Sequence, residues 1–593
     1  MIGFYFKINQ DTKQRIKLIL TRYESLLALS SIEENCLYLF DDSNATKMVQ
    51  SKNVTIYSIG TFIYNKCWGN CALELFAHDL ESGKELAEII ITARGQFCLL
   101  IHYERKVILI TDKTGSFPIY IFENNQVIQI SNIFLLIAKF NPVSFDFQGL
   151  AEFVSNMDYC LGCTLFKEIK LLNDATIYQF GERYVLYRYY NLFNELRFGR
   201  YTDLREVSEL TKKLLTENLS FLKSEDRIFS DITGGFDTRV IATILEKNSI
   251  NFAGGICGEQ VKNELKIAKE VARELKVKLY EDYRIRDIDQ FNLTVSDHFN
   301  ISNGVPLLYH SSELINYYKK IKEHFDIHIT GFGGTELLTQ SFRNSALYSS
   351  EINTKNIFVQ YFGFLDIFKD KYITKNLYYN FLDKKIKSIL QKAPSSNIRN
   401  IANYLKFSSY SRYYHGSIIA AHNCILPHYS PYLEDNIVRL SLETDYELKA
   451  DHNIQKVILT QTNPSVSSII TSRGYSAYGS IQKIEEDRKT KSIKIFLKIF
   501  LLKKINKYAY LRKIKDIILK YMTVSKVVPP IEDSNRLFWS QAVKTKFSEE
   551  MRIFYIIDKK KFNGTLNNRE DRNKLLSKIA YLDKLMNDYN PQF

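Results

Sequence analysis

The sequence is short of cysteine, of long apolar runs and of repeats, and each shortage excludes a class of protein. Eight cysteines in 593 residues favour free thiols in a reducing cytosol over a disulfide framework. No apolar run approaches the ~18–20 residues that a membrane-spanning helix needs. The first residues, "MIGFYFKINQDTKQR", lack the basic start and the apolar core of a signal peptide, so we expect a cytoplasmic protein. No internal repeat or low-complexity tract is present, which excludes a repeat array.

Two pairs of cysteines lie close together in the sequence. Cys160 and Cys163 have a spacing compatible with a zinc knuckle or a redox pair, whereas Cys67 and Cys71 fit such sites less well. No histidine cluster accompanies either pair. We therefore interpret these residues as buried or partly buried free thiols, with a zinc or redox site as the alternative.

The net charge of +14 is concentrated in one segment. Residues 489–520 contain eleven Lys or Arg and a single acid, Asp516, so they carry +10 of the total. The rest of the chain is close to neutral, and no nucleic-acid binding is expected. Within the segment, Lys491, Lys494 and Lys498 share one helical side, which is typical of a solvated face over a packed stripe. An acidic partner such as a precursor peptide is one alternative; contact with a membrane surface is another, which we do not favour.

The order of apolar runs along the chain predicts three regions, and a length of 593 residues predicts two to four domains. Residues 1–190 contain short β-branched runs such as "VTIYSIGTFIY" and "KVILITD" with helical runs between them, which predicts a layered α+β domain. In residues 200–480, strands such as "DRIFSDI" and "INFAGGIC" alternate with helices, which indicates a parallel sheet. Residues 481–593 are basic and helical, with a linker predicted at Pro529–Pro530.

The stretch "DITGGFDTRV", residues 231–240, lies where a predicted strand of the parallel sheet ends and a helix begins. The adjacent glycines Gly234 and Gly235 let backbone N–H groups point at one spot, and the helix N-terminus adds positive potential. The hydroxyls of Thr233 and Thr238 complete a nest suited to pyrophosphate, and Asp237 suits a bridging magnesium ion. The spacing is neither that of a Walker A loop nor G-x-G-x-x-G, and a purely structural turn is the alternative.

The motif "ITGGFDT" resembles the S-G-G-x-D-S loop of the PP-loop ATP pyrophosphatases and, among these, that of the asparagine synthetase family. Further stretches match that family in the same order, and the matches span residues 60–475. They are "GQFCLLIHYERKVILITDKTGSFPIYIF" (G-x-F … D-x-x-G-x-x-P-L-Y), "TLFKEIKLL" (T-L-F-x-x-I-x-x-L), "ELKIAKEVARELKV" (the helix after the second strand), "TGFGGTELL" (the second glycine loop, S-G-x-G-x-D-E) and "SPYLEDNIV" (P-F-L-D-x-x-[LI]-V).

This resemblance implies three domains and one reaction. An Ntn-hydrolase-like αββα sandwich of the glutaminase type (1–190) is expected before a PP-loop (HUP-like) parallel-sheet α/β synthetase domain (200–480) and a helical C-terminal extension (481–593). The implied enzyme uses ATP and Mg²⁺ to adenylate a carboxylate, releases pyrophosphate and lets an amine form the amide. The implied nucleotide-binding residues are Thr233, Gly234, Gly235, Asp237, Thr238, Gly331, Gly333 and Gly334, with Asp237 and Glu336 as candidate metal ligands.

The start of the chain departs from the family. The family's glutaminase uses a cysteine that is exposed when the first Met is removed, but Ile2 and Gly3 stand here. We therefore expect no glutamine hydrolysis and a first domain that serves as a scaffold. In this respect the chain is similar to the family's β-lactam synthetases and lasso-peptide cyclases, which take the amine from their own substrate.

The second loop and the catalytic lysine depart as well. Phe332 stands where the family has a glutamate or tyrosine that acts in acid–base chemistry, and Thr335 stands where it has a second magnesium-binding aspartate, although Glu336 is retained next door. The family's catalytic lysine should fall near "TSRGYSAYG", where Arg473 is found. Arginine does not give up its proton but can stabilise a developing anion. Lys456, in the preceding helix, is the second catalytic candidate.

These observations predict an ATP-dependent amide-forming ligase that does not hydrolyse glutamine. The alternatives are a non-catalytic relative that binds a partner and an asparagine synthase that uses free ammonia. The carboxylate can come from a small amino acid, a sugar acid or a peptide precursor. His428 lies near the expected cleft by its order in the chain, and we interpret it as a structural histidine in preference to a substrate contact.

Overall fold

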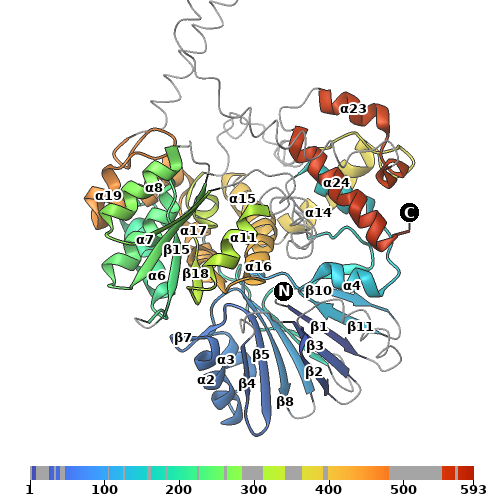
Figure 1. Cartoon of the computed structure of the whole chain (residues 1–593), viewed down its shortest axis with the longest axis horizontal. Coiled ribbons are helices and arrows are strands. Elements are labelled where there is room, and N and C mark those ends of the chain that lie inside the picture. The colour runs from blue at the N-terminus through green and yellow to red at the C-terminus, as the bar shows by residue number, and fades with distance from the viewer. Residues whose placement is uncertain are drawn as a thin grey trace, which may run out of the picture.

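The computed structural model describes residues 3–8, 26–32, 35–40, 47–103, 106–124, 127–156, 162–180, 185–223, 226–258, 263–283, 312–340, 363–391, 398–479, 551–567 and 572–592. Two antiparallel sheets, one parallel sheet and the helices that cover them account for most of these residues (Figure 1). The basic segment 489–520, Cys160, Ile2 and the linker at Pro529–Pro530 lie outside the described residues.

The N-terminal unit is built on two six-stranded antiparallel sheets, with strand orders β12-β10-β11-β1-β3-β2 and β14-β13-β9-β8-β5-β4. The strands of the first sheet are β1 (Gly3–Ile8), β2 (Leu26–Ile32), β3 (Asn35–Phe40), β10 (Tyr120–Glu123), β11 (Ile128–Ser131) and β12 (Ile169–Leu171). Those of the second are β4 (Lys47–Gln50), β5 (Val54–Gly60), β8 (Phe97–Tyr103), β9 (Lys106–Thr111), β13 (Thr176–Phe180) and β14 (Val185–Arg188).

Alternation of apolar side chains along these strands produces four layers. In β8, Cys98 and Leu100 face the first sheet, whereas Leu99 and Ile101 face the helices α2 (Gly69–Glu81) and α3 (Leu86–Ile90). In β10, Ile121 joins the core between the sheets, and Tyr120 packs toward α4 (Phe134–Phe140) and α5 (Phe147–Ser155). Because each sheet is apolar on both faces, each needs a helix layer outside it. The result is an αββα sandwich.

The second unit contains a five-stranded parallel sheet in the order β17-β16-β15-β18-β19. Its strands are β15 (Ile228–Asp231), β16 (Phe252–Gly258), β17 (Leu279–Tyr283), β18 (Ile327–Ile329) and β19 (His428–Tyr429). The chain adds β16 and β17 on one side of β15, then adds β18 and β19 on the other. Sheet growth therefore changes direction between β15 and β18, which is the topological switch point where open α/β sheets bind ligands.

Most helices of residues 204–468 connect and cover these strands, whereas α14 (Lys375–Leu390) packs on α5 of the sandwich (Figure 1). The helices are α6 (Leu204–Leu219), α7 (Phe236–Lys247), α8 (Asn263–Glu274), α11 (Ser312–Ile321), α12 (Gly334–Leu338), α14, α15 (Ile398–Leu405), the π-helix η2 (Lys406–His415), α16 (Gly416–Asn423), α17 (Asp435–Glu443), α18 (Asn453–Thr462) and α19 (Pro464–Ser468). The short 3-10 helix η3 (Pro431–Leu433) follows β19. Ser430, between β19 and η3, ties the two units together, because its backbone exchanges hydrogen bonds of 2.9 and 3.2 Å with the Gln96 side chain of the sandwich.

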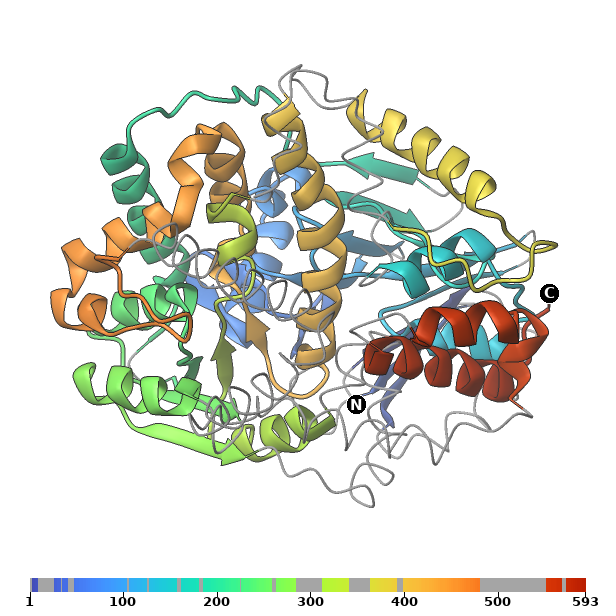
Figure 2. The same cartoon turned by 90° about the horizontal axis from the view of Figure 1, so that it is seen from above.

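The C-terminal helix α24 (Arg572–Tyr589) packs on the helices of the sandwich (Figure 2), and α23 (Lys559–Asn567) lies on the far side of α24 (Figure 1). The Lys578 ammonium on α24 donates to the carbonyl oxygen of Phe153 on α5 at 2.7 Å, and Gln592 pairs with Ser144 in a parallel bridge. The end of the chain thus joins the first unit, although the sequence places it last.

The predicted fold class is confirmed. A sandwich of two antiparallel sheets precedes a parallel-sheet α/β unit, and helices follow it. None of the helices in the described ranges is both long and apolar enough to cross a membrane.

Candidate functional site

The first glycine loop connects β15 to the start of α7, as the sequence predicts. The Thr233 backbone N–H donates to the Thr238 hydroxyl oxygen at 3.2 Å, and the two threonine hydroxyls lie 2.9 Å apart. The Gly235 N–H donates to the Thr233 hydroxyl at 3.2 Å. Gly235 is exposed at the N-terminus of α7, where no side chain caps the helix. The positive end of the helix therefore faces solvent and is open to an anion.

The second glycine loop leaves β18 and packs directly on the first. A Cβ on Gly331 would lie 2.9 Å from Thr238 Cγ2, and one on Gly334 would lie 2.7 Å from Asp237 Cγ. Both separations are shorter than ordinary contacts, so these positions accept only glycine without a shift of the neighbouring loop. Gly333 has φ +88°, which turns the chain into α12. The loops at residues 233–238 and 331–336 therefore form one site at the switch point.

Asp237 is the carboxylate that the two loops share. Its Oδ2 accepts a hydrogen bond from Thr335 Oγ1 at 2.5 Å, and its Oδ1 accepts one from Gln455 Nε2 at 3.0 Å. Burial raises the pKa of Asp237 to about 6 against the opposing effect of these donors, and the negative charge of Glu336 raises it further. Asp237 is thus a carboxylate whose charge is costly until a cation approaches.

Glu336 and Lys406 act on the charge of Asp237, and His415 of the π-helix η2 lies against Glu336. His415 Nε2 lies 3.7 Å from Glu336 Oε2, and burial lowers the pKa of His415. Burial also lowers the pKa of Lys406, while the charges of Glu336 and Asp237 act to raise it. Phe332 stacks on the His415 ring with centroids 5.8 Å apart. The sequence indicated neither Lys406 nor His415, because η2 lies in a region that matches no motif; π-helices are frequent at functional sites.

The segment that contains Arg473 lies against the first loop. The buried Arg239 guanidinium donates to the carbonyl oxygens of Ile469 at 2.7 Å and Ile470 at 2.8 Å, and to that of Gly234 at 3.3 Å. Ser472 N–H also donates to the Gly234 oxygen, at 3.4 Å. Arg473 follows with an exposed side chain, so the chain brings it beside the candidate phosphate site.

Lys456, the second catalytic candidate, has a different set of neighbours. Its ammonium bonds Asp451 Oδ2 at 2.8 Å and the Gly479 carbonyl oxygen at 2.7 Å, and it lies 5.2 Å from the centre of the Tyr475 ring. These contacts hold the turn at residues 475–479 onto α18 and do not reach either glycine loop.

A buried histidine cluster lies beneath the second loop. His328 Nε2 lies 3.0 Å from Asp231 Oδ1, and His422 Nδ1 lies 3.4 Å from His428 Nε2. Burial lowers the pKa of His422 to about 3 and also lowers that of His428, with the neighbouring histidines adding to the effect. Thr330 donates to Asp231 at 2.9 Å. His428 is thus an interior residue of this cluster, 1% exposed.

The residues of the two loops fit a cation that is shared with phosphate. Asp237 accepts hydrogen bonds from Thr335 and Gln455, but a carboxylate offers about four lone-pair positions, so it can still bind a metal ion. Mg²⁺ typically binds one or two protein carboxylates and takes its other ligands from phosphates and water. Thr335 offers no second carboxylate, and among the described residues Glu336 is the acid whose charge acts on Asp237. Within the described ranges no group of three or more His, Cys, Asp or Glu residues could hold a metal ion unaided.

The cysteines form no disulfide in the described parts of the chain. Cys67, Cys71, Cys98, Cys163, Cys257 and Cys424 are free thiols. Burial raises the pKa of Cys67 and that of Cys163, the latter to about 12, so neither is an activated thiolate.

No protein-family model matches this chain, and no curated protein does. Similar solved structures include glutamine phosphoribosylpyrophosphate amidotransferase from B. subtilis complexed with ADP and GMP, at 8% identity over 39% of this chain and 60% of that chain, with a TM-score of 0.19. NMN synthetase from Francisella tularensis is 14% identical over 35% of this chain and 93% of its own, with a TM-score of 0.19. The NH3-dependent NAD synthetase from Campylobacter jejuni subsp. jejuni NCTC 11168, in complex with the nitrate ion, is 17% identical over 34% and 94%, with a TM-score of 0.18.

This chain thus covers 60% of the amidotransferase chain. About a third of this chain matches nearly the whole length of either synthetase. Likeness at these TM-scores assigns no activity. The functional assignment therefore depends on the geometry of the two loops.

Proposed function

We propose that this chain is an ATP-dependent ligase that adenylates a carboxylate, releases pyrophosphate and joins the acyl group to an amine. The observation that carries the proposal is the position of the two glycine loops. They leave the carboxyl ends of β15 and β18, the strands on either side of the switch point, and they contact each other through Gly334 and Asp237. The resemblance of both loops to those of the asparagine synthetase family supports the same reaction.

The first loop is proposed to hold the phosphates of ATP. The uncapped start of α7 after Gly235 supplies N–H donors, and the hydroxyls of Thr233 and Thr238 lie at their side. Arg473 and Lys406 supply positive charge from two other segments. A Mg²⁺ ion held by Asp237, with Glu336 as its neighbour, would neutralise the phosphate charge as pyrophosphate leaves.

In the proposed reaction, a carboxylate oxygen of the substrate attacks the α-phosphorus of ATP, and the bond to the pyrophosphate leaving group breaks. The amine nitrogen then attacks the acyl carbon, displaces AMP and loses a proton. Phe332 has no group that can accept this proton. The Glu336–His415 pair beside it contains two groups that can accept a proton, and burial, which lowers the pKa of His415, keeps its ring neutral beforehand.

The source of the amine is the second part of the proposal. Because the sequence has Ile2 where the family's glutaminase has cysteine, we propose that the amine comes from the substrate and not from glutamine. A small molecule or a peptide can supply the carboxylate. The purified protein should convert no glutamine to glutamate above the blank rate, and a clear rate would refute this part of the proposal.

Removal of the shared carboxylate tests the main proposal. In Asp237→Asn, release of pyrophosphate from ATP with a panel of carboxylate and amine substrates should fall by at least about 100-fold, because the cation and the loop geometry are lost together. Glu209→Gln, a change at a 51% exposed carboxylate on α6, is the control and should keep full activity. Equal rates in the two variants would refute the role of Asp237.

A non-catalytic nucleotide-binding protein is the second candidate. The observation in its favour is that Thr335 replaces a metal-binding carboxylate and occupies one oxygen of Asp237. This candidate predicts thermal stabilisation by ATP and Mg²⁺ without release of pyrophosphate on any substrate.

A further inference from the structure

The segment at residues 428–434 lies between the sandwich and the two glycine loops. It contains β19 and η3, and all of its residues are buried. Backbone N–H and C=O groups that are buried in this way need hydrogen-bond partners, and those partners decide where the segment lies. Some of its partners come from the sandwich and others come from the loops, so the segment links the position of the loops to the sandwich.

Gln96 of the sandwich holds the centre of this segment. It directly precedes β8 and is 0% exposed. Its Oε1 accepts a hydrogen bond from the Ser430 N–H at 2.9 Å, and its Nε2 donates to the Ser430 carbonyl oxygen at 3.2 Å. One side chain thus satisfies both polar groups of one backbone residue, as a neighbouring strand does in a sheet. Because both groups are buried, loss of the Gln96 amide is costly unless Ser430 moves.

Two further hydrogen bonds from the sandwich hold the ends of the segment. Thr61 Oγ1 donates to the His428 carbonyl oxygen at 3.2 Å, and the Gly95 N–H donates to Glu434 Oε1 at 2.9 Å. Gly95 has φ +105°, and a Cβ there would collide with the Thr61 carbonyl oxygen, so only glycine fits this turn. The sandwich therefore holds the segment at both ends as well as at its centre.

The same segment also binds both glycine loops. Ser430 Oγ donates to the Phe332 carbonyl oxygen of the second loop at 2.6 Å. The hydroxyl of Tyr432, a fully buried side chain, donates to the Asp237 carbonyl oxygen of the first loop at 3.1 Å. Ser430 is therefore held by Gln96 through its backbone and holds the second loop through its side chain, while Tyr432, two residues later, holds the first loop.

We propose that Gln96 is a positioning residue of the candidate active site. By fixing Ser430 it sets where the two glycine loops lie relative to each other, although it belongs to the sandwich. This inference rests on the proposed ligase function where it concerns ATP, and it gives the sandwich a role in catalysis that needs no glutaminase. A displacement of about 1 Å at a catalytic site can cost about 100-fold in rate, so a residue that fixes the loops affects the reaction without touching the substrate.

Hydrogen exchange of the ligand-free full chain tests the inference directly. Gln96→Leu keeps most of the bulk of the side chain and removes both bonds to Ser430. Exchange should accelerate at least roughly ten-fold in peptides that cover residues 232–240 and 331–339, because both loops then open locally. Since no ligand is added, this result does not depend on the proposed ligase activity.

Two single substitutions should give a pattern that a general loss of stability does not produce. Ser430→Ala removes the bond to Phe332 and keeps the backbone bonds to Gln96, so exchange should accelerate in the second loop alone. Tyr432→Phe removes the bond to Asp237 and should accelerate exchange in the first loop alone. Both variants keep the test valid if Gln96→Leu does not fold.

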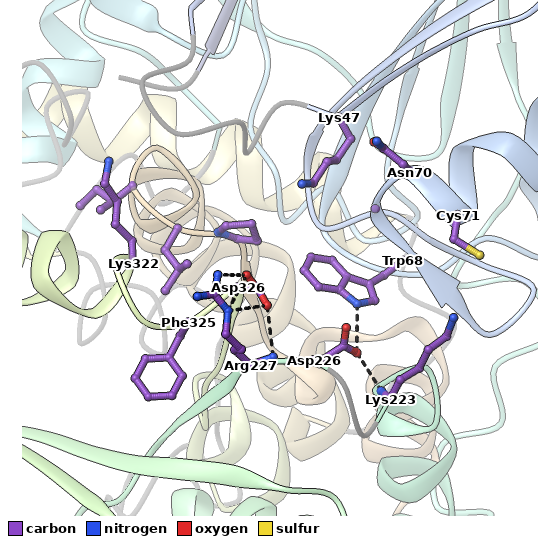
Figure 3. A pocket seen from close by; sticks show the side chains of 14 residues that line it. Lys47, Trp68, Asn70, Cys71, Lys223, Asp226, Arg227, Lys322, Phe325 and Asp326 are labelled. Atoms are coloured by element: carbon purple, nitrogen blue, oxygen red, sulfur yellow. Dashed lines mark hydrogen bonds and ion pairs between the residues drawn. The ribbon is translucent and has the colours of Figure 1, made fainter.

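A second contact between the two units provides the matched control. Trp68 Nε1 of the sandwich donates to Asp226 Oδ2 at 3.3 Å, in the wall of a cavity that lies where β15 begins, at the edge of the sheet opposite the loops (Figure 3). Trp68→Phe breaks this bond and should leave exchange in both loops unchanged. Leu99→Ala destabilises the sandwich at a buried side chain that faces α2 and α3, and it should also leave the loops unchanged.

Calorimetry with ATP and Mg²⁺ connects the loops to the proposed function. Gln96→Leu should raise the dissociation constant at least roughly ten-fold, whereas Trp68→Phe should bind as the parent does. Exchange at the parent rate in Gln96→Leu, or equal acceleration in Trp68→Phe, overturns the role of Gln96. A parent protein that binds no ATP refutes the ligase proposal instead, and the exchange rates still decide the role of Gln96.

Discussion

The Thr335 hydroxyl donates a hydrogen bond to the Asp237 carboxylate across the boundary between the two glycine loops, with Oγ1 and Oδ2 2.5 Å apart. In the sequence, Thr335 stands where the asparagine synthetase family has a magnesium-binding aspartate. The structure shows that the residue has a second effect, because its hydrogen bond opposes the rise that burial causes in the pKa of Asp237. Thr335 thus stabilises the charged form of the carboxylate that the site retains.

Replacement of Thr335 by valine should therefore destabilise the protein. Thr335→Val keeps the shape of the side chain and leaves a partly buried carboxylate without one donor, which should lower the free energy of unfolding by about 2 kcal/mol. Denaturant titration at pH 7 measures the change. Thr243→Val on α7 is the matched control, since its buried hydroxyl has no hydrogen-bond partner among the described residues and its loss should be neutral or stabilising. Equal losses in both variants would contradict the role of Thr335.

The close packing of the two glycine loops leads to a second prediction. A Cβ on Gly334 would lie 2.7 Å from Asp237 Cγ and Oδ1, so Gly334→Ala should force the loops apart and cost about 1–3 kcal/mol of stability. It should also weaken nucleotide binding, measured by calorimetry with ATP and Mg²⁺. Gly564 on α23 has nothing within 4 Å of its Cβ position, and Gly564→Ala should stabilise the protein by about 0.5–1 kcal/mol. A stable, fully binding Gly334→Ala variant would show that the loops are not in contact.

Substitution of the two catalytic candidates, Arg473 and Lys456, should affect different properties: activity for Arg473 and stability for Lys456. Arg473 is exposed and follows Ser472, whose N–H bonds the Gly234 oxygen, so Arg473→Ala should lower pyrophosphate release by about 100-fold and leave the melting temperature unchanged. Lys456 is bonded to Asp451 and to the Gly479 oxygen, so Lys456→Ala should lower the free energy of unfolding by about 3 kcal/mol. The reverse pattern, with an inactive but stable Lys456 variant, would identify Lys456 as the catalytic cation.

Local pattern was sufficient to predict the sheets and the first loop. The short, continuous apolar runs of β8 and of the segment before Thr233 identify buried strands, because both faces of such a strand are covered. The glycines at 234 and 235 mark the turn because few other residues suit a phosphate nest. These features depend on neighbours in the sequence, which a single chain displays directly.

Other parts of the site depend on contacts that are distant in the sequence and could not be predicted. β19 is two residues long, too short for a periodic signal, yet His428 pairs there with His328 of β18. A π-helix that matches no motif brings His415 to Glu336 and places Lys406 where the charges of Glu336 and Asp237 act on it. In the sequence, Arg239 looks like an ordinary residue of an amphipathic helix. In the structure it is fully buried and donates a hydrogen bond to the Ile469 carbonyl oxygen in the segment before Arg473. Only the folded chain shows these roles.

The buried histidine cluster predicts a loss of stability in mild acid. Burial and the neighbouring His328 lower the pKa of His422 to about 3 from an ordinary 6.5. As the pH falls from 6.5 toward 3, His422 is protonated in the unfolded chain but stays neutral in the folded protein. Stability that is present at pH 7 is therefore lost over this interval. At pH 5 the loss from this residue should be about 2 kcal/mol.

His422→Phe tests this prediction, because it retains an aromatic ring against Tyr318, 4.6 Å away, and removes the titrating group. Urea unfolding at pH 7 and at pH 5 should show a smaller loss in this variant than in the parent protein. His78→Gln, at an 81% exposed histidine, should lose as much as the parent does. His428 and Asp231, which face His422 within the cluster, are unchanged in both variants. If all three proteins lose stability equally, the acid sensitivity does not come from His422 and the cluster is not kept neutral by burial.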